Sequence, residues 1–334
     1  MADQLLKGIL ATIGNTPLVE LECLFPGFRS RVFAKIERFN PGGSIKDRPA
    51  AAMLLDRIRD GELEPGRSVV VESSSGNMAI GLAQICRYYG LRFICVVDAK
   101  TTEQNVAILE AFQAEVQVVK EPDASGEYLA NRLRRVQELV ASTPNAYWPN
   151  QYANPANAKA HHRTMREVAE VLAGKVDYLF CATSTTGTLC GCAAYAREFN
   201  LGTRIVAVDA VGSVLFDDGP PTRRLLPGHG ASVRPPLLDP DAPDEVVHVT
   251  DLDCVIGCRR LATREAILAG GSSGGTVAAL DKLRGRIPPG SNCVLILADG
   301  GDRYLDTVYS DAWVQEHFGE VSYLWKDEPV GGEA

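Results

Sequence analysis

The sequence has no long hydrophobic run and no run of basic residues. No apolar stretch approaches the roughly 18 residues that a membrane-spanning helix needs, and the segment 1–14 is too weakly apolar for a signal peptide. The sequence has 34 Lys and Arg residues and 42 Asp and Glu residues, and the resulting net charge of -8 argues against a nucleic-acid partner. We therefore expect a cytoplasmic protein that acts on a small molecule, with no membrane and no nucleic acid as partner.

Cysteine pairs with metal-ligand spacing are also missing. The nine cysteines are an odd number and lie mostly inside apolar stretches, which is typical of reduced thiols that fill a core. The pairs Cys190/Cys192 and Cys254/Cys258 have short spacings, but no second CxxC or HxxxH accompanies them. The sequence therefore predicts neither disulfides nor a bound metal.

Short apolar runs rich in β-branched residues alternate with helix-length segments along the chain. The runs predict six buried parallel strands, at 68–73, 92–98, 115–120, 176–182, 204–210 and 293–298. The segments between them predict helices at Asn77–Tyr89, Glu127–Leu139, Ala156–Leu172, Thr186–Phe199, Asp253–Ala269 and Thr276–Arg284. The alternation predicts an α/β fold with mainly parallel sheets that are covered by helices on both faces.

Length and loop composition predict two domains. A chain of 334 residues fits two domains of ordinary size, and the Pro- and Asn-rich segment 142–157 is the expected boundary. The segment Asp217–Pro243 is rich in Pro and Gly and lacks periodicity, so we expect a functional loop there. The polar segment 319–334 is expected to be a flexible tail.

A lysine follows a turn rich in proline and glycine in the segment Asn40–Arg48, NPGGSIKDR. Near the start of a helix the backbone dipoles disfavour an ammonium ion, which makes Lys46 a candidate for Schiff-base chemistry. A solvated lysine with Asp47 as its helical neighbour would have the same sequence. The segment alone leaves both interpretations open.

Two further segments place hydroxyl groups between the end of a strand and the start of a helix. They are Val71–Ala83, VESSSGNMAIGLA, and Cys181–Gly191, CATSTTGTLCG. Hydroxyls and free N–H groups at a helix start can bind a carboxylate or a phosphate, although a serine cap would look alike. Neither segment has the spacing of a P-loop or of a dinucleotide-binding fingerprint, so a compact cofactor with one phosphate fits better than a nucleotide.

The segment Ala269–Gly275, AGGSSGG, separates two predicted helices and offers neutral hydroxyl groups beside glycines that permit close backbone approach. A tight turn between helices is the alternative interpretation. Taken together, the segments supply a Schiff-base lysine, a phosphate site, a carboxylate site and a hydroxyl partner for a pyridine nitrogen. These are the groups that pyridoxal 5'-phosphate requires.

Six motifs, in this order, resemble the fold-type II pyridoxal-phosphate enzymes of the cysteine synthase and cystathionine β-synthase family, with their tryptophan synthase β-like fold. They are IGNTPLVEL (13–21), NPGGSIKDR (40–48), ESSSGN (72–77), NQYANPAN (150–157), TSTTGT (183–188) and GGSSGG (270–275). The resemblance implies a homodimer with a large cofactor-binding domain, 1–41 and 152–318. It also implies a small mobile substrate domain, 42–151, that closes on the donor amino acid.

The resemblance also implies roles for single residues. Lys46 would form the Schiff base and remove the α-proton of the donor, Asn77 would lie beside the cofactor's 3-hydroxyl, and Ser272 would face the pyridine nitrogen. The loop expected to bind the cofactor phosphate consists of Ser184, Thr185, Thr186, Gly187 and Thr188. The residues expected near the substrates are Ser74, Ser75, Asn77, Gln151, Tyr152 and Ser184.

Departures from cysteine synthase lie near the expected substrate site. The chain has SSSGNMA in place of TSGNTG, HHRTMRE (161–167) where a TTGPE-like run is usual, and RRLLPGHGASVRPP (223–236) in place of the usual closing loop. This pattern resembles the subfamily that makes N-(2-amino-2-carboxyethyl)-L-glutamate from O-phospho-L-serine and L-glutamate. That product is a precursor of 2,3-diaminopropionate in siderophores and peptide antibiotics.

Several questions stay open at this point. A cysteine synthase that uses sulfide, a serine or threonine deaminase, and a protein without catalytic activity on the same scaffold are the alternatives. A neutral Ser272 makes the cofactor a weaker electron sink than a carboxylate would, which favours β-elimination and replacement over transamination. An arginine of the 223–234 loop is a candidate for binding the donor phosphate or a glutamate carboxylate, and His229 is a candidate supporting residue.

Overall fold

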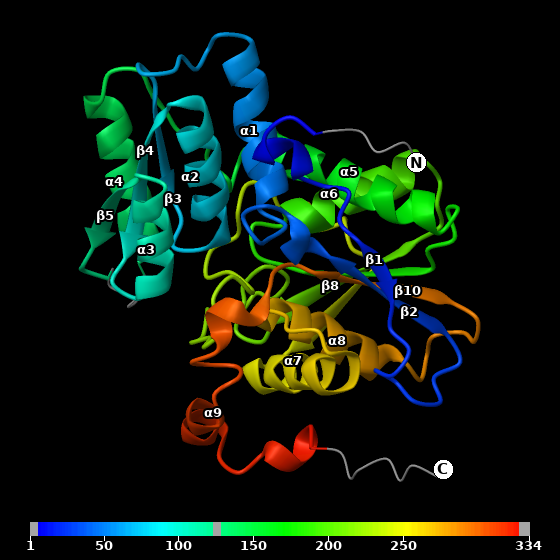
Figure 1. The fold of residues 1–334 in the computed structure, drawn as a ribbon. Helices are drawn as coiled ribbons and strands as arrows, with labels where there is room; N and C mark the ends of the chain where they lie inside the picture. Colours follow the sequence, from blue (N-terminus) through cyan, green and yellow to red (C-terminus); the bar gives the residue numbers. More distant parts are fainter. Residues whose placement is uncertain (1–5, 123–127, 327–334) are drawn as a thin grey trace. The chain divides into compact units, whose positions relative to one another are not determined.

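The computed structural model describes residues 6–122 and 128–326, which divide into two units with one sheet each (Figure 1). Unit 1 comprises the described residues of Met1–Asn15, Phe39–Thr164 and Pro235–Leu237. Unit 2 comprises the described residues of Thr16–Arg38, Met165–Arg234 and Leu238–Ala334.

Unit 1 contains a four-stranded parallel sheet in the order β5-β4-β3-β6. The strands are β3 (Val69–Ser73), β4 (Arg92–Asp98), β5 (Glu115–Val119) and β6 (Ala146–Tyr147). The helices are α1 (Asp47–Arg59), α2 (Asn77–Tyr89), α3 (Glu103–Ala111), α4 (Leu129–Ser142) and the first part of α5 (Pro155–Val171), preceded by the short 3-10 helix η1 (Ile9–Thr12).

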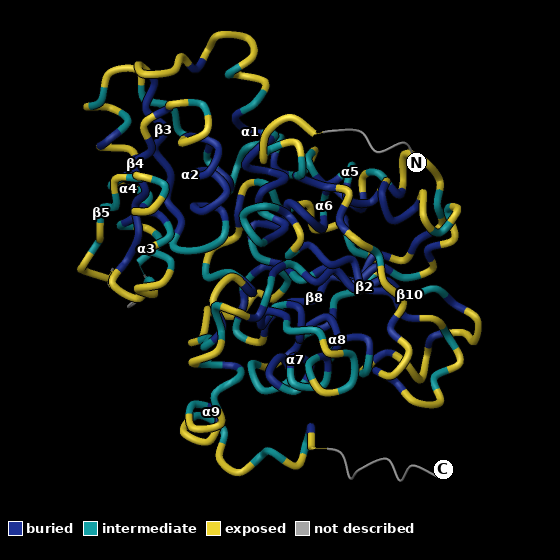
Figure 2. Tube along the Cα trace, viewed as in Figure 1, coloured by how far each residue is buried: buried dark blue, intermediate teal, exposed yellow. Residues whose placement is uncertain are grey.

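The two faces of this sheet pack against different helices. Because alternate residues of a strand point to opposite faces, β3 directs Val70 to one side and Val69 to the other. Val70 belongs to a cluster with Leu54 of α1 and Leu82 of α2, whereas Val69 belongs to a cluster with Val136 of α4. Figure 2 shows β3 and β4 as buried segments, so both faces of these strands are covered.

Unit 2 contains a six-stranded sheet in the order β1-β2-β10-β7-β8-β9, in which only the β1–β2 pair is antiparallel. Its strands are β1 (Leu18–Glu20), β2 (Arg31–Ile36), β7 (Tyr178–Ala182), β8 (Arg204–Ala210), β9 (Glu245–Val249) and β10 (Asn292–Leu297). Its helices are the end of α5, α6 (Gly187–Glu198), α7 (Asp251–Glu265), α8 (Gly271–Leu283) and α9 (Asp311–Phe318), with the 3-10 helices η3 (Gly301–Tyr304) and η4 (Ser322–Leu324).

Glycines bring α7 and α8 into backbone contact. A Cβ atom at Gly257 of α7 would lie 2.1 Å from the carbonyl oxygen of Gly274. A Cβ atom at Gly274 would lie 2.0 Å from the carbonyl oxygen of Cys254. Both distances are far below van der Waals contact, so only glycine allows the two helices to lie this close together. Figure 1 shows the pair side by side below the sheet of unit 2.

The predicted α/β fold and its six parallel strands are confirmed. Each predicted strand is present with its ends within two residues of the prediction, as β3, β4, β5, β7, β8 and β10. The six predicted helices are present as α2, α4, α5, α6, α7 and α8, although Glu127, the predicted start of one of them, lies outside the described residues. The segment Asp217–Pro243 contains no helix or strand, as expected.

The expectation that AGGSSGG links two helices is corrected. Helix α8 already begins at Gly271, because its glycines serve the contact with α7 and do not end a helix. Four strands were not predicted: β1, β2, β6 and β9. The helices α3 and α9 were also missed, and for α1 the sequence indicated only the start.

The predicted domain boundaries stay a prediction. Unit 1 contains residues 6–15 and 152–164 together with the segment 42–151. In the predicted tail, Trp325 is buried in a cluster with Val255 and Val314, and residues 327–334 lie outside the described part. All nine cysteines are free, and seven of them are buried in the two units. None of the helices in the described ranges is long and apolar enough to span a membrane.

Candidate active site

Lys46 occupies the N-cap position of α1 in unit 1. Its backbone N–H donates to the hydroxyl of Ser44 at 3.2 Å, and the carboxylate of Asp47 accepts from the N–H of Gly42, which closes the glycine turn. Burial holds the pKa of His161 well below its usual value, and the positive charges of Lys46 and Arg48 lower it further. The imidazole near the lysine is therefore neutral at physiological pH.

The loop after β3 is held by its carbonyl groups. The side chain of Gln151 donates to the carbonyl of Ser73 at 3.0 Å, and the thiol of Cys95 donates to the carbonyl of Ser74 at 3.2 Å. The side chain of Asn105 donates to the carbonyl of Ser75 at 3.0 Å. Three successive carbonyls are thus fixed by side chains from three different elements. The loop is therefore rigidly oriented at the carboxyl end of β3.

The loop leads directly into α2. The hydroxyl of Ser74 accepts from the N–H groups of Gly76 at 3.4 Å and Ala79 at 3.3 Å, so this serine acts as a cap inside the loop. Asn77 is the first residue of α2, and its side chain is partly exposed. The positive end of the helix dipole therefore lies at Ser75 and Asn77, and binding of an anion there stays a prediction.

Arg132 of α4 reaches the same loop and was not predicted. Its Nη1 atom lies 3.2 Å from the hydroxyl oxygen of Ser75 and 3.1 Å from a carboxylate oxygen of Asp98 at the end of β4. The residue is only 9% exposed, and its Nε atom is buried without a hydrogen-bond partner. A cationic side chain with a donor to spare thus stands beside the predicted substrate loop.

Gln151 contacts the end of β3 before this loop, and Tyr152 follows it in the chain. Gln151 is buried, and its side-chain amide is used to hold Ser73. Tyr152 is partly exposed, and burial raises the pKa of its phenol, while the charge of Arg132 lowers it. Tyr152 is therefore the better placed of the two to meet a ligand, whereas Gln151 supports the loop.

In unit 2 the loop after β7 connects directly to α6. The hydroxyl of Thr183 donates to Asp209 at 3.0 Å, and the N–H of Gly230 donates to the carbonyl of Thr183 at 2.7 Å. Thr186 has a φ of 65°, which is rare for a β-branched residue and marks a position held by its surroundings. The loop therefore presents the start of α6 in a fixed, strained conformation that fits phosphate binding.

The predicted members of this loop differ in exposure. Ser184 is partly exposed, whereas Thr185, Thr186, Gly187 and Thr188 are buried. At the start of α8, Ser272 is partly exposed, while the hydroxyl of Ser273 is buried and accepts from the N–H of Ala298 at 3.1 Å. Of the two neighbouring serines, Ser272 is thus the one left available at the carboxyl end of β10.

Two arginines of the 223–234 loop are engaged mainly by the neighbouring segment 212–218. Arg224 donates to the carbonyl of Gly212 at 2.6 Å and to the hydroxyl of Ser232 at 2.8 Å. Arg234 donates to the carbonyl of Val214 at 2.8 Å and pairs with an exposed carboxylate. Arg223 is exposed. Arg132 is therefore the better candidate for an anion receptor.

His229 lies in the interior of unit 2. Its Nε2–H donates to the carbonyl of Val208 at 3.1 Å, and its Nδ1 lies 3.6 Å from the sulfur of Cys254. Burial lowers the pKa of this histidine, so it is a neutral supporting group beneath the loop after β8.

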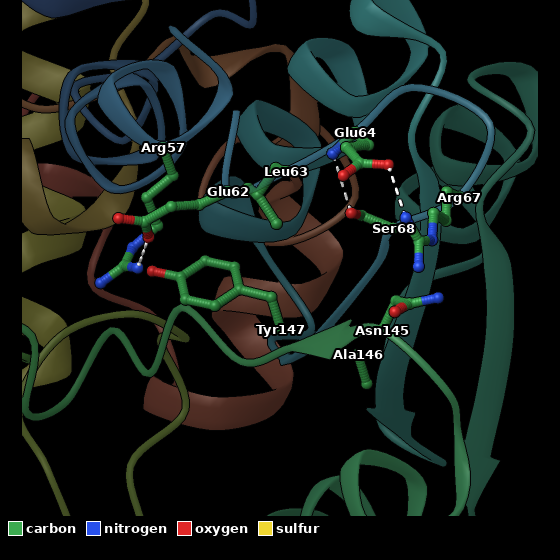
Figure 3. Close-up of a pocket in the computed structure, with 9 residues that line it drawn as sticks. All are labelled: Arg57, Glu62, Leu63, Glu64, Arg67, Ser68, Asn145, Ala146 and Tyr147. Atoms are coloured by element: carbon green, nitrogen blue, oxygen red, sulfur yellow. Dashed lines mark hydrogen bonds and ion pairs between the residues drawn. The ribbon is translucent and has the colours of Figure 1, made fainter. Parts of the chain in front are cut away.

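A surface pocket of unit 1 lies away from these groups. Figure 3 shows its lining, in which Arg57 pairs with Glu62 and Glu64 pairs with Arg67. Ser68 and Asn145, at the amino ends of β3 and β6, also line it. The loop of Ser74 and Ser75 follows the opposite end of β3. The pocket therefore belongs to a different edge of the sheet and is not part of the candidate site.

A family model described as pyridoxal-phosphate dependent enzyme matches residues 9–299. The chain belongs to this family. Pyridoxal phosphate is therefore its cofactor, and the α/β architecture with two largely parallel sheets is that of the fold-type II members.

Known members of the pyridoxal-phosphate family are similar over nearly the whole chain. An N-(2-amino-2-carboxyethyl)-L-glutamate synthase of Ralstonia nicotianae is 48% identical over 309 residues, 92% of this chain and 91% of that protein. A solved O-ureido-L-serine synthase with O-ureido-L-serine bound is 31% identical, with a TM-score of 0.85 over 94% of this chain and 98% of that one. A cysteine synthase of Entamoeba histolytica is 29% identical, with a TM-score of 0.84 over 99% and 94%.

The residues present fit the cofactor of this family. Hydroxyl groups at the start of α6 suit a phosphate, and the strained Thr186 indicates that this loop is built for a ligand. A neutral hydroxyl at Ser272 suits the pyridine nitrogen, and Lys46 suits a Schiff base. The roles of the single residues stay predictions at this point.

Proposed function

We propose that the protein makes N-(2-amino-2-carboxyethyl)-L-glutamate and phosphate from O-phospho-L-serine and L-glutamate by β-replacement. The bond between the donor β-carbon and the phosphate oxygen breaks, and the phosphate leaves with the electron pair. The α-amine of glutamate forms the new carbon–nitrogen bond and loses a proton. The 48% identity to a synthase of this name, over nine-tenths of both chains, is the observation that carries the proposal.

Arg132 supports the choice of a phosphorylated donor. Its guanidinium is buried beside Ser75, and its Nε atom has no hydrogen-bond partner. Asp98 already pairs with Nη1 of this guanidinium at 3.1 Å, so a further anion would be needed to accept a hydrogen bond from the buried Nε. The donor phosphate or a glutamate carboxylate would supply that anion, since arginine suits bidentate binding of both.

The other residues act around the cofactor. Bound pyridoxal phosphate supplies the electron sink that makes the α-proton of the donor acidic and allows its β-substituent to leave. Lys46 would hold the cofactor through Nζ and would carry the α-proton of the donor. Ser184 to Thr188 bind the cofactor phosphate, Asn77 orients the cofactor ring, and Ser272 donates to or accepts from the pyridine nitrogen. The surroundings of the substrates are formed by Ser74, Ser75, Asn77, Gln151, Tyr152 and Ser184.

The proposal includes the setting of the enzyme. The segment 42–151 is the substrate domain that moves during turnover, against a domain of 1–41 and 152–318. The enzyme works as a homodimer in the cytoplasm, for which free, mostly buried cysteines are suited. Its product supplies 2,3-diaminopropionate for a siderophore or a related natural product.

Product analysis tests the proposal. The purified holoenzyme is incubated with O-phosphoserine or O-acetylserine, each with glutamate or with sulfide, and the products are identified by mass. The carbon–nitrogen adduct from phosphoserine and glutamate is the expected result. Cysteine from acetylserine and sulfide, without the adduct, would replace the proposal by a cysteine synthase.

The cysteine synthase alternative has one specific observation in its favour. The solved cysteine synthase of Entamoeba histolytica aligns over 99% of this chain. Its 29% identity is well below the 48% identity of the N-(2-amino-2-carboxyethyl)-L-glutamate synthase, so the alternative ranks second. Formation of pyruvate and ammonia from serine, without any adduct, would instead indicate a deaminase.

A further inference from the structure

A carboxylate in the middle of unit 1 has no role in the reaction described so far. Glu72 lies in β3, one residue before the end of the strand, and is fully buried with 0% exposure. One of its oxygens accepts from the N–H of Ser73 at 2.8 Å and from the indole N–H of Trp148 at 3.1 Å. The other oxygen accepts from the N–H of Gln151 at 3.1 Å.

All of these partners are donors, so they require an acceptor. An ionised carboxylate offers only acceptor sites, which matches a ring of N–H groups better than any neutral side chain does. Burial raises the pKa of Glu72 from its ordinary value to about 7, and the N–H donors oppose that rise. The titratable groups that face it are Cys95 of β4, Tyr147 and Tyr152, and burial raises the pKa of each of them.

The bonds of Glu72 connect two segments that are far apart in the sequence. Ser73 opens the loop with the predicted substrate residues Ser74 and Ser75. Trp148 and Gln151 belong to the segment that follows β6. The side chain of Gln151 also donates to the carbonyl of Ser73. Ser73 is thus linked to the second segment twice, through its N–H by way of Glu72 and directly through its carbonyl.

We propose that Glu72 is a positioning residue, whose buried carboxylate locks the Ser73–Gly76 loop to the Trp148–Gln151 segment and thereby fixes the substrate loop. Its full burial keeps the side chain away from the substrate itself. The inference deepens the proposed function and rests on it in one respect, since it assumes that the loop binds the donor amino acid.

The substitution Glu72→Gln isolates this role. The amide has nearly the same size, but one acceptor oxygen becomes an NH2 donor. Whichever way the amide turns, this donor meets either the N–H of Gln151 or the N–H groups of Ser73 and Trp148. The variant therefore breaks the lock without leaving a cavity and without a buried charge, so the fold is retained.

Two measurements on the holoenzyme test the lock. Hydrogen exchange of the amides in residues 73–79 and 148–157 is expected to become about tenfold faster in the variant, since the ordered loops lose their common acceptor. The KM for the donor amino acid is expected to rise about tenfold, with cofactor content and melting temperature near the wild-type values and a smaller change in kcat.

The same substitution at Glu64 is the matched control. Glu64 lies just before the amino end of β3 and forms an exposed pair with Arg67 at 3.0 Å. Glu64→Gln is expected to leave both exchange and KM unchanged. If Glu72→Gln does not fold, Trp148→Phe removes one donor of the same carboxylate, and a two- to fivefold rise in donor KM is expected.

The outcomes separate this inference from the proposed function. Exchange rates in Glu72→Gln that equal those of the control overturn the lock, whatever the substrates are. Faster exchange with an unchanged donor KM reduces Glu72 to a purely structural residue and also overturns the proposal. Failure of the wild type to use phosphoserine and glutamate contradicts only the proposed function, because the exchange measurement needs no substrate.

Discussion

Each unit contains a strand, a hydroxyl-rich loop and a helix, but the two loops are held in different ways. The Ser73–Asn77 loop of unit 1 is fixed by side chains that include a carboxylate, a guanidinium and a thiol. The Thr183–Gly187 loop of unit 2 is fixed mainly by backbone bonds and threonine hydroxyls. A charged group also reaches the second loop, because Asp209, buried near the end of β8, accepts from the hydroxyl of Thr183.

The difference corresponds to what each loop is proposed to bind. A cofactor phosphate stays in place through every turnover, and backbone groups in a strained conformation provide a permanent site for it. Substrates come and go and differ in charge, and a loop supported by ionisable side chains can respond to them. We therefore expect the loop of unit 2 to keep one conformation during turnover, and the loop of unit 1 to respond to the substrate that is bound.

Loss of Lys46 is expected to have the largest effect. Lys46→Ala removes the Schiff base and the proton carrier, so turnover should fall by about three orders of magnitude or more. Both loops remain intact, and the cofactor should still bind noncovalently at reduced affinity. Turnover and cofactor content are measured together, with exposed Lys282→Ala as the control. Wild-type turnover in Lys46→Ala would contradict the mechanism.

The stability of the protein should depend on pH through Glu72. Burial raises its pKa in the folded state to about 7, above the ordinary value of 4.5, so the folded state binds this proton more tightly than the unfolded state does, although the N–H donors favour the carboxylate. This stabilisation is complete below pH 4.5 and is lost as pH rises through 7, a change of about 3 kcal/mol in the free energy of unfolding. Denaturant titrations at several pH values measure it, and Glu72→Gln should lack this part of the pH dependence.

Replacement of Arg132 should weaken the phosphorylated donor. Arg132→Met keeps the apolar stem but removes charge-assisted hydrogen bonds, and the KM for phosphoserine should rise by about ten- to a hundredfold. Acetylserine, which carries no phosphate, should be affected less. Arg135→Met on the same helix, whose guanidinium binds Gln117, is the matched control. An equal rise in KM for phosphoserine and acetylserine would show that Arg132 does not recognise the phosphate, and would contradict the idea that this loop responds to the charge of the substrate.

A smaller effect is expected at Thr183 of unit 2. Thr183→Val deletes the hydroxyl that donates to Asp209 and leaves the backbone bonds of the loop in place. The loss of one buried hydrogen bond should weaken cofactor binding by about 1 kcal/mol, which corresponds to a dissociation constant about five times higher. Cofactor titration followed by absorbance checks this. A hundredfold loss would show that side chains, and not the backbone, hold this loop.

Much of the fold could be predicted from the sequence because the central strands are continuous apolar runs. β2 escaped prediction because it carries Lys35, whose charge is compensated by Glu167 at 2.8 Å, 132 residues further along the chain. No local pattern reveals such a partner. β6 has only two residues, and β9 contains His248 within a short apolar run, so neither gives a strong signal.

The predicted site included the residues of the loops themselves but not those that support them. Arg132 stands in the sequence NRLRRVQ beside Arg134 and Arg135, and its spacing of four and seven residues to Val136 and Leu139 places it alone of the three on the buried face of α4. The partner that it meets there, Ser75, comes from a distant part of the chain, whereas Arg134 and Arg135 bind Glu138 and Gln117. The role of Glu72, near the end of a buried strand, was likewise not predicted. Two of its donors, Trp148 and Gln151, lie 76 and 79 positions further along the chain.

The contact between α7 and α8 has a consequence for the evolution of the site. Because Gly257 and Gly274 allow no side chain, the spacing of the two helices is set by backbone atoms and cannot drift by small core substitutions. Ser272, two residues before Gly274, is carried by this fixed spacing. Substitutions in the loops of unit 1 should therefore be able to change specificity without altering the spacing that fixes the start of α8.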